Sequence, residues 1–289
     1  MRRLLIRPGA IGDCIVSLPA LECLRADYTE VWVASPNVAL VRFADRVRSI
    51  ASTGLDLLEI RGSEAGPALL DTLAGFDSII SWYGANREQF RDVTRQLGLP
   101  FEFLSPLPPE KAGNREPGAA PVHAVDFYLT QARRFSECNA GAVPRIPCRP
   151  SRDEKGFVAI QPFSGSPSKN WPLERYRRLA RQLERDVPVE WCAGPEECLP
   201  GARRFEDLYE LGCWLAGARL YIGNDSGITH LAAAVGTPVV ALFGPTDPRV
   251  WAPRGKLVRV VAAGRPGASM DQIPVAAVTE AARQLLAGA

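Results

Sequence analysis

The sequence has 289 residues, which is enough for one large domain or two ordinary ones. Its 46% apolar and 23% charged residues are typical of a folded protein, which excludes a disordered or collagen-like chain. The formal net charge of +2 is too small to give the whole molecule a field for gripping nucleic acid.

Short β-rich runs alternate with stretches of helical spacing in the first half of the chain. A helical stretch at residues 15–24 follows the first of these runs. Alternation of this kind predicts a parallel α/β sheet. The expected strands are residues 3–7, 30–35, 47–52, 77–84 and 101–105.

A second series of strands and helices follows residues 139–155, whose proline density resists regular structure. We therefore expect two Rossmann-like domains, residues 1–148 and 149–289, with ligands at the carboxyl ends of their strands. The last helix, within residues 271–288, is expected to pack near the domain junction. The expected strands are residues 156–162, 188–194, 220–225, 238–244 and 257–263, and the other helices are residues 173–184, 206–216 and 227–235.

Cysteines and the N-terminus indicate the cellular compartment. The seven cysteines are odd in number and form no CxxC pair, so we expect reduced, mostly buried thiols. The N-terminal apolar run is too short for a signal peptide, and no stretch approaches the ~18 apolar residues of a membrane span. A soluble, cytoplasmic protein is expected.

A glycine-containing turn, "RPGAIGD", joins the first expected strand to its helix. Gly9 and Gly12 let the backbone turn tightly and approach a ligand closely. Asp13 lies near the helix start, where a carboxylate commonly serves as a cap and where it can also face a ligand. The GxGxxG spacing is absent and no acidic residue ends the strand at residues 30–35, so this is not the dinucleotide fingerprint.

A second turn, residues 164–169, lies just ahead of a helix that is expected to begin near Trp171. Small hydroxyl residues, a glycine and one lysine suit a phosphate group, which backbone amides, hydroxyls and an ammonium would bind. A flexible serine-rich loop with a solvated lysine explains the composition equally well. The candidate phosphate ligands are Ser164, Gly165, Ser166, Ser168 and Lys169.

A third turn, Asp225-Ser226-Gly227, separates an apolar strand from the next helix. Ser226 or Asp225 is expected to cap that helix, and its free N–H groups suit an anion. Asp225 would repel a bare phosphate, which favours sugar hydroxyls as its partner. His230 lies on the first helical turn, where a lone histidine is more often packed than catalytic. With His123 the only other histidine, the sequence predicts no metal site. The strand after this helix ends in a further turn, Gly-Pro-Thr-Asp.

Three stretches of the chain resemble the signature regions of glycosyltransferase family 9, the ADP-heptose:lipopolysaccharide heptosyltransferases. "HAVDFYLTQARR" is similar to the helix that closes the family's N-terminal half. The resemblance covers most of the chain, and its third stretch is the most specific. The three stretches, in the family's order and spacing, are "LLIRPGAIGDCIVSLPALECLR", "QPFSGSPSKNWPLERYRRLA" and "YIGNDSGITHLAAAVGTPVVALFGPTDPRVWAP".

The resemblance implies the GT-B fold, in which two Rossmann-like domains with parallel sheets face a central cleft. The first domain would bind the acceptor and the second the nucleotide-sugar donor. The implied reaction is inverting, metal-independent transfer of a sugar, heptose from ADP-heptose, to a hydroxyl of a lipopolysaccharide-core or related glycan. No cofactor and no nucleic acid are implied. The protein would be cytoplasmic, with at most peripheral contact at the inner membrane.

The resemblance also assigns roles to single residues. Asp13 would be the general base, and Lys169 would stabilise the leaving diphosphate. Glu197, with Glu196 as the second choice, would bind the ribose, although a solvated glutamate pair is a common alternative. The other donor-binding residues implied are Ser164, Gly165, Ser166, Ser168, Asp225, Ser226, Gly227 and His230. The acceptor-side candidates are Gly12, Arg61 and Arg87, although a solvated side chain is the favoured interpretation of the two arginines in so arginine-rich a chain.

Residues 195–207 are shorter than the helix and strand that the family usually places there. That region flanks the nucleotide base, so recognition of adenine has less support than recognition of phosphate. A second class of function stays open: a nucleotide-sugar 2-epimerase, or a non-catalytic nucleotide-sugar binder, would share the two-domain plan.

Overall fold

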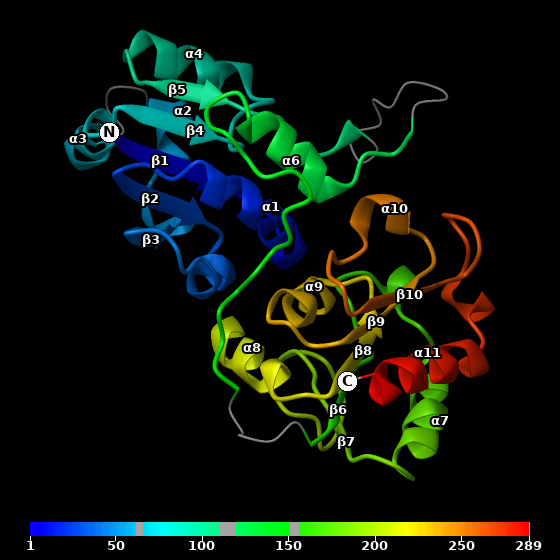
Figure 1. The fold of residues 1–289 in the computed structure, drawn as a ribbon. Helices are drawn as coiled ribbons and strands as arrows, with labels where there is room; N and C mark the ends of the chain where they lie inside the picture. The colour runs from blue at the N-terminus through cyan, green and yellow to red at the C-terminus, as the bar shows by residue number, and fades with distance from the viewer. Residues whose placement is uncertain (62–65, 110–119, 151–155, 289) are drawn as a thin grey trace. The chain divides into compact units, whose positions relative to one another are not determined.

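The computed structural model describes residues 1–61, 66–109, 120–150 and 156–288 (Figure 1). The chain divides into two compact units, Met1–Ala142 and Val143–Ala289. Each unit contains one five-stranded sheet in which every pairing is parallel. The predicted fold class of two Rossmann-like α/β domains is therefore confirmed.

The sheet of unit 1 has the strand order β3-β2-β1-β4-β5. Arg7, the last residue of β1, lies opposite Val33, the last residue of β2, so these two strands end together. Its elements are β1 (Arg2–Arg7), α1 (Ile11–Cys23), β2 (Tyr28–Val33), η1 (Ser35–Leu40), β3 (Arg46–Ser49), η2 (Ile50–Ser52), α2 (Leu57–Arg61), α3 (Pro67–Ala74), β4 (Ser78–Ser81), α4 (Glu88–Gln96), β5 (Phe101–Phe103) and α6 (Ala124–Ala132).

Helices cover both faces of this sheet. Leu4 and Ile6 of β1 pack on one face in a core with Leu73 of α3 and Phe90 of α4. Successive strand residues point to opposite faces, so Arg7 points to the other face. That face is covered by α1 and α6, which lie side by side (Figure 1).

The sheet of unit 2 has the strand order β10-β9-β8-β6-β7. From β6 the chain continues to β7 on one side of the sheet, and from β8 it continues to β9 and β10 on the other side. β6 and β8 are neighbours, so the direction of winding reverses between them, as in other doubly wound sheets. Its elements are β6 (Val158–Gln161), η4 (Pro167–Lys169), α7 (Leu173–Leu183), β7 (Val189–Trp191), α8 (Leu208–Ala216), β8 (Leu220–Asn224), α9 (Gly227–Ala234), β9 (Val239–Phe243), α10 (Pro248–Trp251), β10 (Val258–Ala262), η5 (Met270–Gln272) and α11 (Val275–Ala287).

The core of unit 2 also explains its layers. Ile160 of β6 and Ile222 of β8 pack with Leu179 of α7 and Val278 of α11. The two helices α7 and α11 lie side by side on this face, while α8 and α9 contact each other and α9 also contacts β8 and β9 (Figure 1). No helix among the described residues has the length and apolar character that crossing a membrane requires.

All ten expected strands are present, the limits of several elements differ from the expected ones, and two helix starts differ for physical reasons. The first helix begins at Ile11 instead of residue 15, because Asp13 accepts a hydrogen bond from the backbone N–H of Ala10 and closes the first turn. The last helix begins at Val275, because Pro274 disfavours helical backbone at the residue before it, and Ile273 is extended.

The prediction that all seven cysteines are reduced is wrong for two of them. Cys23, at the end of α1, and Cys138, which follows α6, form a disulfide. Packing of α6 against α1 brings the two residues together although they are 115 positions apart in the sequence, a separation that carries no local motif. Of the five free cysteines, Cys14 and Cys192 are buried and Cys198 is exposed.

Candidate active site

Asp13 lies at the carboxyl end of β1, on the first turn of α1. Its Oδ2 atom accepts a hydrogen bond from the N–H of Ala10 at 3.3 Å, so the carboxylate does cap the helix. Gly9 has a φ of 125°, and a Cβ atom there would lie 3.0 Å from the Cβ atom of Asp13. Only glycine therefore fits the turn that presents this carboxylate.

A buried arginine stabilises the same turn through hydrogen bonds. Arg7 is 2% exposed, and its guanidinium donates to the carbonyl oxygens of Pro8 at 2.6 Å and Asp13 at 3.1 Å. It also donates to the hydroxyl of Tyr128 on α6 at 2.8 Å. Burial raises the pKa of Tyr128 to about 12, so its hydroxyl stays protonated at neutral pH and donates to the carbonyl of Pro106. The guanidinium thereby fixes β1, α1 and α6 around the Asp13 turn.

The acceptor-side candidates differ in their surroundings. Gly12 lies on the first turn of α1 and is partly exposed. Arg87 follows β4, forms an ion pair with Glu59 and donates to the hydroxyl of Tyr83 at 2.6 Å, so it is engaged within unit 1. Arg61 ends α2, and its side chain lies outside the described residues.

The serine-rich turn of unit 2 connects the carboxyl end of β6 to α7. Ser164 Oγ lies 2.9 Å from the carbonyl oxygen of Ser166, and the hydroxyls of Ser166 and Ser168 are 2.9 Å apart. Gly165 lies between them with no atom within 4 Å of the position a Cβ would take. The turn is thus ordered by its own hydrogen bonds, and its last three residues before Asn170 form the short helical turn η4.

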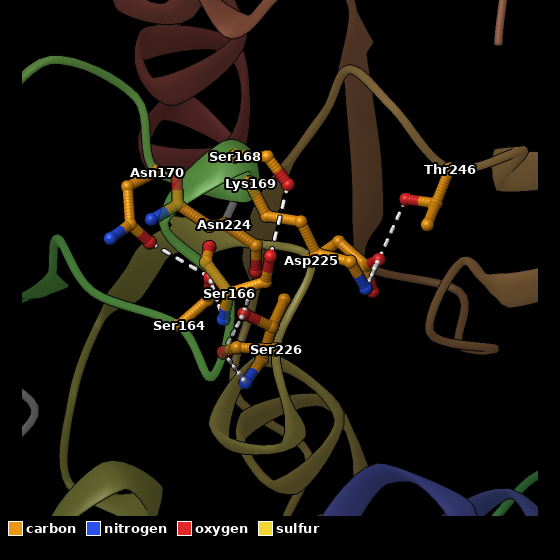
Figure 2. Close-up of polar contacts among 10 residues, drawn as sticks. Ser164, Ser166, Ser168, Lys169, Asn170, Asn224, Asp225, Ser226 and Thr246 are labelled. Carbon is orange, nitrogen blue, oxygen red and sulfur yellow. Dashed lines mark hydrogen bonds and ion pairs between the residues drawn. The ribbon is translucent and has the colours of Figure 1, made fainter. Parts of the chain in front are cut away.

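Lys169, the last residue of this turn, forms an ion pair with Asp225 of the turn after β8, with Nζ 2.6 Å from Oδ2 (Figure 2). The side chain of Lys169 is 30% exposed and that of Asp225 9% exposed. Asp225 follows β8, which lies beside β6 in the sheet, so the pair joins the ends of two neighbouring strands. Ligands of doubly wound sheets bind at such a point of reversed winding.

The Asp225–Gly227 turn is held by a dense set of hydrogen bonds. Ser226 caps α9, since its hydroxyl accepts from the N–H of Thr229. Gly227 is the first residue of α9, and His230, on its first turn, is 5% exposed. The burial of His230 agrees with its interpretation as a packed residue.

Glu197 lies in the turn after β7, where its Oε2 atom accepts from the N–H of Gly194 at 2.6 Å. Its neighbour Glu196 is exposed. In the short connection between Gly194 and α8, Arg203 forms an isolated parallel bridge back to Cys192. Glu197 is therefore engaged in the turn, whereas Glu196 is solvated.

Three further residues of these turns were not identified from the sequence. Asn224 bonds the backbones of Trp171 and Pro162 and joins the third turn to the second. Thr246 donates to Oδ2 of Asp225 at 2.7 Å, and Arg7 supports Asp13. The Gly-Pro-Thr-Asp pattern at a strand end was a signal for Thr246. An arginine next to a run of apolar residues gave none for Arg7, because arginine is normally exposed.

Among residues 1–61, 66–109, 120–150 and 156–288, no three His, Cys, Asp or Glu side chains lie together in a way that could hold a metal ion.

Comparison with known proteins decides the family. The sequence matches the model of Glycosyltransferase family 9 (heptosyltransferase) over residues 120–273, more than half of the chain. It is 30% identical to lipopolysaccharide heptosyltransferase 3 of Escherichia coli K12, over 84% of this chain and 82% of that protein. The chain belongs to glycosyltransferase family 9.

Solved structures of similar fold agree with this membership. A family 9 glycosyltransferase from Veillonella parvula superposes with a TM-score of 0.73 at 17% identity, over 100% of this chain and 98% of that one. Heptosyltransferase WaaC of E. coli, solved with ADP-2-deoxy-2-fluoro heptose, superposes with a TM-score of 0.70 at 18% identity, over 98% and 99% of the two chains. This family 9 protein is thus a glycosyltransferase of the GT-B fold, and its family favours transfer over epimerisation.

Proposed function

We propose that this family 9 enzyme transfers heptose from ADP-heptose to a hydroxyl of a lipopolysaccharide-core or related glycan, with inversion at the anomeric carbon. The observation that carries the proposal is the Lys169–Asp225 pair at the reversed-winding point of the unit 2 sheet. A cation and a carboxylate side by side suit a ligand that combines a diphosphate with a sugar. The names of the relatives, lipopolysaccharide heptosyltransferase 3 and WaaC with an ADP-heptose analogue, support the donor and the acceptor class.

Unit 2 would bind the donor. Lys169 would neutralise the diphosphate, with the Ser164–Ser168 turn and the amides after Ser226 as further donors. Asp225 would accept hydrogen bonds from sugar hydroxyls. As the bond between the anomeric carbon and the diphosphate oxygen breaks, ADP leaves with the bonding electrons, and the charge that develops on it is stabilised by the Lys169 ammonium.

Unit 1 would bind the acceptor and supply the base. The acceptor hydroxyl oxygen attacks the anomeric carbon and loses its proton to the carboxylate of Asp13. The cap bond from Ala10 and the bond from Arg7 to the Asp13 carbonyl would hold that carboxylate in one orientation. Gly12 and the region of Arg61 and Arg87 would contact the acceptor.

The proposal includes no metal and no cofactor, since the Lys169 ammonium would take the place of a metal ion at the diphosphate. It places the enzyme in the cytoplasm, with peripheral contact at the inner membrane when the acceptor is a glycolipid. Turnover in the presence of a chelator is expected to equal turnover without it. Loss of turnover that added metal restores would contradict this part.

The test of the whole proposal is release of nucleotide from ADP-heptose, compared with UDP- and GDP-sugars, in the presence of lipopolysaccharide-core acceptors. Asp13→Asn keeps the shape and the capping ability of the side chain but removes the proton acceptor. We expect turnover to fall by ~10²–10⁴, equivalent to ~3–5 kcal/mol of barrier. Binding of the donor should be unchanged.

A matched control is Asp77→Asn, since Asp77 also accepts a hydrogen bond from a backbone N–H, that of Arg2 at 2.6 Å, and lies just before β4, at the end of the unit 1 sheet opposite to the Asp13 turn. Its turnover should stay at the wild-type level. If Asp13→Asn reduces turnover by less than about fivefold, well below that range, Asp13 is only a cap. If ADP-heptose gives no product while another nucleotide-sugar does, the proposed donor is wrong.

A further inference from the structure

The turn after β9, Gly244 to Asp247, contacts the proposed donor site, although none of its residues is among the assigned donor-binding residues. Thr246 Oγ1 donates to Oδ2 of Asp225 at 2.7 Å, and Lys169 Nζ lies 2.6 Å from the same oxygen (Figure 2). β8 lies between β6 and β9 in the sheet. One carboxylate oxygen therefore connects residues at three successive strand ends.

The backbone of this turn is fixed on both sides. A Cβ atom on Gly244 would lie 2.7 Å from Sδ of Met270 and 2.9 Å from the carbonyl oxygen of Ala268, so only glycine permits the close approach of that segment. On the other side, Asp247 caps α10 by accepting from the N–H of Arg249. Thr246 is thereby placed before any ligand arrives.

The two donors to Asp225 differ in what donor binding would do to them. Lys169 is a cation at the end of a flexible chain, and a diphosphate would attract its ammonium away from, or into sharing with, the carboxylate. Thr246 is neutral and would keep its bond. Among the described residues it is the one other side chain that donates to Asp225, which is nearly buried.

We propose that Thr246 is a positioning residue of the donor site, which holds the Asp225 carboxylate toward the sugar when Lys169 turns to the diphosphate. The inference rests on the proposed function, because it takes Asp225 as the sugar-binding group. It assigns a role to the Gly-Pro-Thr-Asp turn. Thr246 would support recognition of the sugar through Asp225, and Lys169 would bind the diphosphate.

The test compares the binding of ADP-heptose and of ADP by titration calorimetry. Thr246→Val removes the hydroxyl at constant shape, so affinity for ADP-heptose should fall by about 10- to 100-fold, the effect of losing one buried hydrogen bond to a charged group. Affinity for ADP, which lacks the sugar, should change less than about threefold, a difference too small for a lost buried bond. Thr246→Ser should restore the affinity for ADP-heptose.

Thr279→Val is the matched control, since Thr279 donates to Gln182 at 2.8 Å in the same unit, outside the three turns. It should change neither affinity. Equal loss of both ligands in Thr246→Val, or no rescue by serine, would overturn the inference and leave the proposed function standing. A wild-type protein that binds neither ADP nor ADP-heptose would instead contradict the proposed function itself.

Discussion

Replacing Lys169 with methionine separates the stabilising role of its ion pair from its role in catalysis. At the observed 2.6 Å, two unit charges attract by ~6 kcal/mol at an effective dielectric constant of about 20. Desolvation of both groups and the partial exposure of Lys169 cancel most of that energy. Lys169→Met leaves a nearly buried carboxylate whose remaining side-chain donor among the described residues is Thr246, so we expect a loss of ~2 kcal/mol in the free energy of unfolding.

The double variant Lys169→Met, Asp225→Asn removes the uncompensated charge. Its free energy of unfolding should lie within ~1 kcal/mol of the wild-type value, because exchanging both partners of a buried pair costs little stability. Both variants should lose donor affinity. Urea unfolding and calorimetry measure the two properties, with Lys256→Met, an exposed lysine, as the control. A single variant as stable as the wild type would refute the reasoning about the pair, and one with unchanged affinity for ADP would remove Lys169 from the site.

Two other predictions concern unit 1. Arg7→Met should lower the free energy of unfolding by ~2–4 kcal/mol, since it leaves three acceptors without their donor. Tyr128→Phe, which removes one hydroxyl, should lower it by ~1 kcal/mol. Urea unfolding that gives the opposite order would contradict the hydrogen-bond network of Arg7. Burial raises the pKa of the Cys14 thiol from 9.0 to about 12. Between pH 9.0 and about pH 12 the folded state therefore keeps a proton that the unfolded state has lost. That stabilisation is complete below about pH 9 and disappears as the pH rises toward 12, by ~1.4 kcal/mol per pH unit. Cys14→Ala should flatten this slope in unfolding curves between pH 7 and pH 11, and iodoacetamide at pH 8.5 should label the exposed Cys198 before Cys14.

The strands were predictable because parallel, buried strands are continuous apolar runs bounded by turn residues. The same turns marked the candidate site, since ligands collect at the carboxyl ends of such strands and Asp13, Lys169 and Asp225 each follow one. Local patterns therefore identified these three residues, but they missed Arg7, Asn224 and Thr246, which also lie at strand ends.

Contacts between distant positions could not be predicted in this way. Lys169 and Asp225 are 56 residues apart, and their contact depends on β6 and β8 being neighbours, which the order of strands along the chain does not reveal. The same holds for Arg87 and Glu59, which form an ion pair while Arg87 stays exposed, as composition suggested. The sequence predicts which groups are present at a strand end, and the sheet order determines which of them meet.

The disulfide between Cys23 and Cys138 makes most of unit 1 a covalently closed ring. Every peptide bond between the two cysteines, including those of β2 to β5, lies inside the ring, so one cut by a protease cannot release a fragment. A nicked chain should therefore run as a single species on a gel until it is reduced. For a ring of ~100 residues, the closure also restricts the unfolded chain by ~4–5 kcal/mol in the entropic treatment of such links. Reductant in the buffer therefore changes both how this unit tolerates proteolysis and how readily its broken pieces stay together.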